Sequence, residues 1–426
     1  DRIFAAKLAA LRTLFYLSAA DEARTRDFEL FCLDEGEGLR QFAEWCAAQA
    51  SESEHHGAPK HAGRDPQELV QFHMWLQFIA DEQRRVAQER AVAAGMRLGI
   101  MTDLAVGIHP GGADAATLHE VLVPDASVGA PPDQYSQQGQ DWSQPPWNPQ
   151  QLAEAGYGPW RDLLRTVLRH SGGIRVDHVL GLFRLFWLPR MDTPMHGAYM
   201  NYDFEAMVGV LVLEAQRAGA VVVGEDLGTF EPWVQDVLRD KGILGTSVLW
   251  FESVPPEAPR PSQQYRNLAL TAVGTHDLPP TAGYLEGAHN ALRHKLGLVK
   301  ESLEELNATD AVWISQVLAA AQAEGAFDNS PLADVDFLDR DLGEYDDVDT
   351  LVEGLTRFVA STPSAMTCTN LVDMVGDTRI QNQPGTNREM YPNWCIPLCD
   401  ASGTPVLIED LPDVALFQRI AAASAR

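Results

Sequence analysis

Six apolar segments, each long enough for one buried strand, alternate with helical stretches along the chain. They cover residues 96–106, 173–176, 220–224, 246–251, 268–274 and 365–371. Strands that are apolar on both faces and separated by helices are typical of a parallel α/β sheet. Polar residues recur at the carboxyl ends of these segments, which is the rim that carries the active site of a (β/α)8 barrel. We therefore predict an α/β fold, a TIM barrel with helical insertions.

The six segments are two short of the eight strands that a closed barrel needs. We assign them to strands 3 to 8 and expect the first two strands to be encoded upstream, because the sequence starts without methionine and directly in a helical pattern. The pattern predicts a helical subdomain over residues 1–95 and the barrel over residues 96–426. The barrel would carry a substrate loop, residues 107–150, and a helical insertion, residues 287–350. A doubly wound open sheet is the alternative, but no GxGxxG or GxxxxGK[ST] motif follows any of the strands.

The charge and the cysteines limit the partners and the compartment. A formal net charge of −28 over 426 residues argues against nucleic acid, which is bound by clustered Lys and Arg. The five cysteines are odd in number and include no CxxC pair, which indicates a reducing compartment. We see no run of the roughly 18 apolar residues that a membrane span needs and no signal peptide. We expect a soluble, cytoplasmic chain without a membrane partner.

Three carboxylates stand at the ends of three different predicted strands. Asp177, Glu225 and Asp277 are separated by 48 (225 − 177) and 52 (277 − 225) residues, and each interval suits a helical crossover. In a barrel such positions converge on one pocket. Arg175 shares a face with Asp177 by the period of two along a strand, and an adjacent guanidinium favours the ionised carboxylate. A purely structural Arg–Asp pair remains an alternative for this motif.

Carboxylates in one pocket suit glycosyl transfer, because one of them can attack the anomeric carbon while a protonated one gives its proton to the leaving oxygen. In the retaining mechanism the two carboxyl groups lie about 5–5.5 Å apart. The alternative chemistry is a metal-assisted hydrolase, since barrel rims also host metal sites. Its candidate ligands would be His178, Glu225, Asp226, His276 and Asp277.

The long polar stretch over residues 107–150 contains Tyr135, Trp142 and Trp147 among many Gly, Pro and Gln residues. Loops of this length are usually functional or disordered. Aromatic side chains in such a loop can stack on the apolar faces of a sugar ring. They could instead hold the loop against its own domain.

The segments that carry the three carboxylates resemble a known family. GIRVDH (173–178), VVVGEDLG (221–228) and GTHDLPPTAGYL (274–285) are similar to the signature segments of the 4-α-glucanotransferases, or amylomaltases, of the α-amylase superfamily. The resemblance extends through LGIMTDLAVGIHPGGADA, GAPPDQYSQQGQDWSQPPWN and QNQPGTNREMYPNW. It covers nearly the whole chain and is closest to the actinobacterial type.

The resemblance assigns a role to each matching residue. It implies that Asp177 is the nucleophile, that Glu225 is the general acid/base, and that Asp277 stabilises the transition state through the donor sugar. It further implies that Arg175 and His276 orient the nucleophile and the ring. By the same resemblance, Tyr135 and Trp142 would help to hold the acceptor glucan. Asp103 would either contact the glucan or have a structural role.

The activity that the resemblance implies is transfer of α-1,4-glucan segments between maltooligosaccharides, which come from starch or glycogen. It implies a covalent glucosyl-enzyme and neither a cofactor nor a metal. A non-enzymatic alternative is a barrel that binds glucan but turns it over weakly or not at all.

Overall fold

The computed structural model describes residues 2–52, 65–132, 138–228, 230–255, 257–338 and 340–425. The chain forms two compact units. The first unit comprises residues 1–130 and 141–222, and the second comprises residues 131–140 and 223–426.

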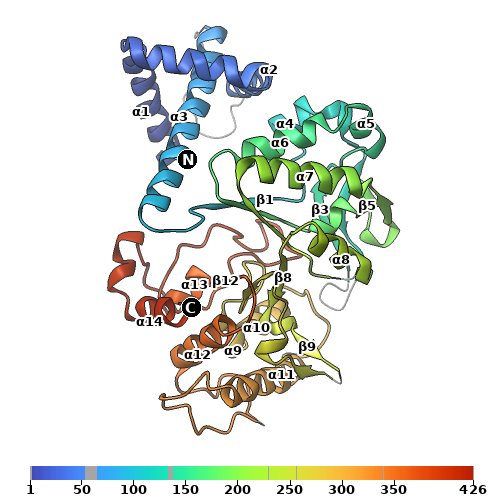
Figure 1. Cartoon of the computed structure of the whole chain (residues 1–426), viewed down its shortest axis with the longest axis vertical. Coiled ribbons are helices and arrows are strands. Elements are labelled where there is room, and N and C mark those ends of the chain that lie inside the picture. The colour runs from blue at the N-terminus through green and yellow to red at the C-terminus, as the bar shows by residue number, and fades with distance from the viewer. Residues whose placement is uncertain are drawn as a thin grey trace. The chain divides into compact units, whose positions relative to one another are not determined.

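The first unit begins with three helices, α1 (Arg2–Ser18), α2 (Glu22–Glu52) and α3 (Pro66–Ala93), which pack together (Figure 1). α3 begins at Pro66 because Asp65 caps it, with its side chain accepting a hydrogen bond from the backbone N–H of Gln67. The apolar stripe of α3 supplies the core of the group through Phe72, Trp75 and Phe78.

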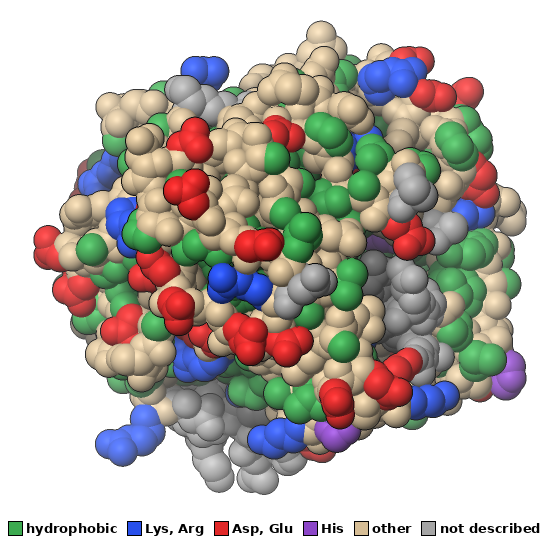
Figure 2. All heavy atoms as spheres, turned by 90° about the horizontal axis from the view of Figure 1, so that it is seen from below, with side chains coloured by type: hydrophobic (Ala, Val, Ile, Leu, Met, Phe, Trp, Pro, Cys, Tyr) green, Lys and Arg blue, Asp and Glu red, His purple; other side chains and the backbone are tan. Residues whose placement is uncertain are grey.

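The surface is strongly acidic, as the composition predicts. On the face that Figure 2 shows, Asp and Glu side chains are spread widely, with single Lys and Arg side chains between them. No single helix in the described part of the chain is long and apolar enough to cross a membrane. By length and composition alone, α1 and the Glu22–Gln49 part of α2 pass together as a pair bent by 107°.

Parallel strands form the centre of the first unit, in the order β1 (Met101–Leu104), β4 (Gly173–Val176) and β7 (Val221–Gly224). β1 and β4 pair in the register that places Asp103 beside Arg175. The chain enters β4 through Gly172, where a Cβ atom would lie 1.8 Å from the carbonyl oxygen of Leu98. Only glycine allows this approach of the two backbones.

An antiparallel sheet of four strands adds to the first unit, in the order β3-β2-β5-β6. The sequence pattern does not predict this sheet. Its strands β2 and β3, together with the short helix α4, lie within residues 107–150, for which the composition predicts one polar loop. The strands and the other helices of this unit are β2 (Ala126–Ala130), β3 (Gln140–Gln144), β5 (Arg184–Pro189), β6 (Ala198–Asn201), α4 (Ala113–Thr117), α5 (Pro149–Glu154), α6 (Gly158–Leu168) and α7 (Phe204–Ala218).

The second unit has its own parallel sheet, in the order β8 (Gly245–Val248), β11 (Ala269–Ala272) and β12 (Met366–Cys368). Within this unit the end of β7 joins β8, because Val223 forms a parallel bridge with Leu244. A strand is thus found in each of the six segments that the sequence indicates. The fourth strand is shorter than the apolar run, whose last three residues, Leu249–Phe251, form a 3-10 turn.

Helices cover this sheet and enclose an apolar cluster of the second unit. α11 (Leu303–Ala323) and α12 (Val348–Ala360) each contribute four of its buried side chains, and Phe327 and Phe337 fill the space beside them at 1% exposure each. α11 begins with a capping box between Ser302 and Glu305. The remaining elements are α8 (Pro232–Asp240), α9 (Thr281–Leu285), α10 (Ala288–Lys295), α13 (Leu371–Val375), α14 (Ala415–Ala423), β9 (Ser253–Val254) and β10 (Ala258–Pro259).

A buried carboxylate fixes the start of α9. Asp373 on α13 accepts hydrogen bonds from the backbone N–H of Thr281 at 2.6 Å and from the Thr281 hydroxyl at 3.0 Å. Asp373 is only 3% exposed. Burial raises the pKa of Asp373 to about 6.

Replacing Asp373 by asparagine is therefore expected to change how stability depends on pH. Between about pH 4 and pH 6 the native carboxyl holds a proton that the unfolded chain releases, so wild-type stability falls as the pH rises. The amide of Asp373→Asn does not titrate, and it should gain about 2–3 kcal/mol relative to wild type across this window. Unfolding midpoints from pH 4 to 7 measure the difference. The exposed Asp334→Asn is the control, and parallel curves for Asp373→Asn and wild type would contradict the prediction.

Candidate functional site

Arg175 binds two carboxylates in the first unit. Ile174 and Val176 are buried at 0% and 3% exposure, so Arg175 projects from the opposite face of β4. Its Nη1 donates to Asp103 Oδ1 at 2.8 Å and its Nη2 lies 2.8 Å from Asp177 Oδ1. The side chain of Arg175 is 20% exposed, whereas those of Asp103 and Asp177 are 52% and 34% exposed. The ion pair is thus present, and it still leaves the Asp177 carboxylate accessible.

The residue after Asp177 turns the chain sharply. His178 has φ 42°, in the left-handed region, and the 3-10 segment Val179–Leu182 follows it. Burial lowers the pKa of His178 to about 4, so the imidazole is neutral at pH 7. The ring of Trp142, on β3, lies edge-on to it with 5.5 Å between the ring centroids. The fold therefore brings Trp142, from the predicted substrate loop, next to the Asp177 turn.

Glu225 and Asp226 follow β7 directly, and their environments differ. Glu225 is half-buried, and its Oε1 accepts a hydrogen bond from the backbone N–H of Leu227 at 2.8 Å. Asp226 is 3% exposed. Its two oxygens accept hydrogen bonds from the Thr246 backbone at 2.8 Å and from the Arg266 guanidinium at 2.5 and 3.2 Å. Asp226 therefore links the end of β7 to the next strands, whereas Glu225 is only half-buried.

Asp277 lies in the turn after β11 and is held from two sides. Its Oδ2 is 3.2 Å from His276 Nε2, and its Oδ1 accepts a hydrogen bond from Asn382 Nδ2 at 2.6 Å. The side chains of His276 and Asp277 remain 35% and 43% exposed. Sequence analysis did not single out Asn382, although QNQPGTNREMYPNW was among the segments that carry the family resemblance.

The predicted site residues thus form two groups. Arg175, Asp103, Asp177 and Trp142 lie in the first unit, and the second unit holds Glu225, His276 and Asp277. Tyr135 lies outside the described residues. In the part of the chain that the structure describes, no three His, Cys, Asp or Glu side chains are arranged to hold a metal ion. Asp226 is a candidate metal ligand of the alternative hydrolase, but its two oxygens accept hydrogen bonds from Thr246 and Arg266.

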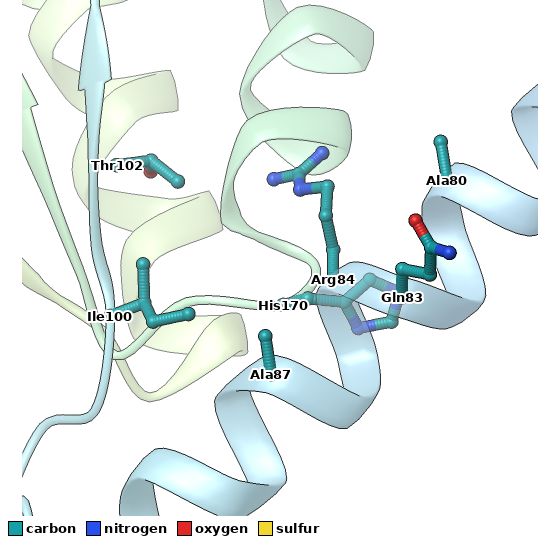
Figure 3. A pocket seen from close by; sticks show the side chains of 7 residues that line it. All are labelled: Ala80, Gln83, Arg84, Ala87, Ile100, Thr102 and His170. Carbon is teal, nitrogen blue, oxygen red and sulfur yellow. The ribbon is translucent and has the colours of Figure 1, made fainter. Parts of the chain in front are cut away.

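A cavity of about 340 Å³ lies elsewhere in the first unit (Figure 3). α3 lines it with Ala80, Gln83, Arg84 and Ala87, and the start of β1 and the residues before β4 contribute Ile100, Thr102 and His170. These positions are at the amino ends of the strands, whereas Asp177 follows the carboxyl end of β4. The cavity is therefore separate from the predicted carboxylates.

One family of known proteins matches nearly the whole chain. A family model described as 4-alpha-glucanotransferase matches residues 1–401. The chain is 46% identical over 432 residues to a protein of Mycobacterium tuberculosis named 4-alpha-glucanotransferase, covering 96% of this chain and 57% of that protein. A protein of the same name from Haemophilus influenzae is 33% identical over 77% of this chain and 46% of its own length.

Two solved structures of amylomaltases also match the chain. The crystal structure of amylomaltase from Corynebacterium glutamicum matches with a TM-score of 0.92 and 56% identity, over 100% of this chain and 60% of that one. Amylomaltase from Streptococcus agalactiae, solved in complex with acarbose, has a TM-score of 0.70 at 18% identity over 98% of this chain and 78% of that one, and so shares the fold. The chain spans 57% of the length of the mycobacterial relative. The family resemblance that the sequence indicates is confirmed: the chain belongs to the 4-alpha-glucanotransferase family.

Proposed function

We propose that the protein containing this chain is a 4-alpha-glucanotransferase that moves α-1,4-glucan segments between maltooligosaccharides. The observation that carries the proposal is the family match over residues 1–401, within which three acidic residues follow parallel strands. The relatives' names supply the reaction. The accessible Asp177 carboxylate, held by Arg175, supplies a group able to perform its central step.

In the proposed mechanism, Asp177 attacks the anomeric carbon of the donor glucan and forms a glycosyl ester. The glycosidic C–O bond breaks, and Glu225 gives its proton to the leaving oxygen. A hydroxyl of the acceptor glucan then attacks the same carbon and passes its proton to Glu225. The ester bond to Asp177 breaks in this step, so the Asp177 carboxylate is regenerated. Asp277, with His276 beside it, would stabilise the positively charged transition state.

The positioning of these groups favours the roles. Arg175 holds one oxygen of Asp177 at 2.8 Å, which orients the carboxylate for attack. Trp142 would stack on the acceptor glucan and exclude water, which matters because hydrolysis differs from transfer only in the attacking hydroxyl. Asp103 would act mainly through Arg175, and Tyr135 would contribute a second aromatic contact.

We further propose that the strands belong to a TIM barrel as strands 3 to 8, with helical residues 1–95 and the insertion 287–350 outside the barrel. The described strand pairings support this assignment, because neighbouring strands follow the chain order. All five cysteines are present as thiols and not as disulfides, which suits a reducing compartment, and we propose the cytoplasm. The partners would be maltooligosaccharides from starch or glycogen.

The test is to supply the intact protein with maltotriose alone and analyse the products. A transferase releases glucose and forms maltopentaose and longer chains, and EDTA leaves the rate unchanged. A metal-assisted hydrolase would lose activity in EDTA and form no longer chains. Tight binding of maltoheptaose without any product would instead favour the glucan-binding alternative.

A further inference from the structure

The loop over residues 380–395 presents the large aromatic side chain of Trp394 beside His276. It is the loop that supplies Asn382, whose amide binds Asp277. Trp394 stands at its other end, with 5.3 Å between the centroids of its ring and the His276 ring. His276 is itself 3.2 Å from Asp277. Two side chains of one loop therefore flank the His276–Asp277 pair.

Hydrogen bonds fix the path of this loop. The backbone N–H of Trp394 donates to Gln381 O at 2.9 Å, which joins the two ends of the loop. Asn393 Oδ1 accepts from the backbone N–H of Gln383 at 2.8 Å, and Asn393 Nδ2 donates to Thr386 at 2.9 Å. The hydroxyl of Tyr391 donates to the carbonyl oxygen of Ile380 at 2.7 Å. The position of Trp394 is thus set by the loop and not by burial of its ring.

The backbone conformation of Trp394 has a steric cost that the burial of its side chain does not offset. Its φ is 60°, in the left-handed region that costs a bulky residue of order 1 kcal/mol. Its side chain nevertheless remains 63% exposed, so little of this cost is offset by removing the indole from water. Strained residues of this kind cluster at ligand-binding sites, where the strain presents a group in advance.

We propose that Trp394 is a substrate-binding residue, an aromatic platform on which a glucose ring of the glucan stacks while Asp277 binds the ring hydroxyls. Indole offers a wide flat face to the C–H groups of a pyranose. The contact with His276, whose ring plane is tilted by 48° from the indole plane, helps to orient this face. The proposal rests on the glucanotransferase function proposed above. It adds an apolar contact to a site whose other identified groups in the second unit are polar.

The experiment compares Trp394→Ala, Trp394→Phe and Trp394→Gly in the intact protein. KM and kcat are measured with maltotriose, and the Kd of maltoheptaose is measured by calorimetry with Asp177→Asn added to stop turnover. We expect Trp394→Ala to raise KM and Kd about tenfold with little change in kcat, and Trp394→Phe to restore most of the loss. Met390→Ala is the matched control, because Met390 is a 43% exposed apolar residue of the same loop, and it should behave as wild type.

Trp394→Gly separates binding from folding. Glycine accepts a φ of 60° without strain, so this variant should keep or raise the unfolding temperature while its Kd rises as in Trp394→Ala. An unchanged Kd in both Trp394→Ala and Trp394→Gly would contradict the proposal that Trp394 binds the glucan. A loss of activity confined to kcat would contradict it too. If the protein with Trp394 intact neither transfers from maltotriose nor binds maltoheptaose, the proposed function fails together with this inference. Normal transfer with an unchanged Kd removes only the inference.

Discussion

Replacing Asp177 by asparagine is expected to lower transfer from maltotriose by about a thousandfold or more. The amide cannot form the glycosyl ester, so the covalent route is closed while the shape of the site is kept. Glucose release measures the loss. Binding of maltoheptaose should persist, because the polar contacts of Asp277 and the loop around Asn382 are untouched.

Asp103→Asn is the matched control for this variant. Asp103 and Asp177 each lie 2.8 Å from the same guanidinium, so either substitution removes one charge from Arg175. We expect Asp103→Asn to lose about tenfold or less, since only the orientation of Arg175 changes. Equal losses in the two variants would mean that the Arg175 network, and not a nucleophile, accounts for the effect. Wild-type activity in Asp177→Asn would remove the nucleophile assignment altogether.

Replacing Glu225 by glutamine is expected to lower transfer from maltotriose by about 10²–10⁴-fold, because the leaving oxygen then receives no proton. The loss should depend on the leaving group. With α-maltotriosyl fluoride as donor, fluoride departs without a proton, so the first step should proceed and glycosyl-enzyme should accumulate. Intact-mass spectrometry detects the added sugar, and the same sample denatured before substrate addition is the control. An equal loss on both donors would show that Glu225 acts in another way.

The strands could be predicted because each carries a short apolar run that must be buried in a sheet covered by helices. The start of a helix is marked in the same way where a proline opens it, as Pro232 opens α8 (Pro232–Asp240). The end of a strand is harder to predict than its existence. Residues 249–251 extend the apolar run of β8 but form a 3-10 turn. Leu249 and Trp250 are buried there, so an apolar run does not mark where the strand ends.

The antiparallel sheet could not be predicted, because β2 pairs with a strand about sixty residues later, as when Val128 lies opposite Trp187. Such pairing leaves no mark in the local pattern. The same limit applies to the site. Asp177 and Glu225 could be predicted because each follows a strand directly. Asn382 and Trp394 lie on an irregular loop, where no helical or strand period distinguishes one polar or aromatic residue from the next.

The adjacent residues Glu225 and Asp226 affect how a mutational screen of this protein's activity must be interpreted. Glu225 and Asp226 would both appear intolerant to substitution, yet for opposite reasons. Loss of Asp226 leaves Arg266 and the Thr246 backbone without their buried partner, so the protein itself would be scarce in the cell. Loss of Glu225 would leave a normal amount of protein that does not turn over. Screens that normalise activity to the quantity of folded protein would therefore separate these neighbours, and a screen of colonies alone would not.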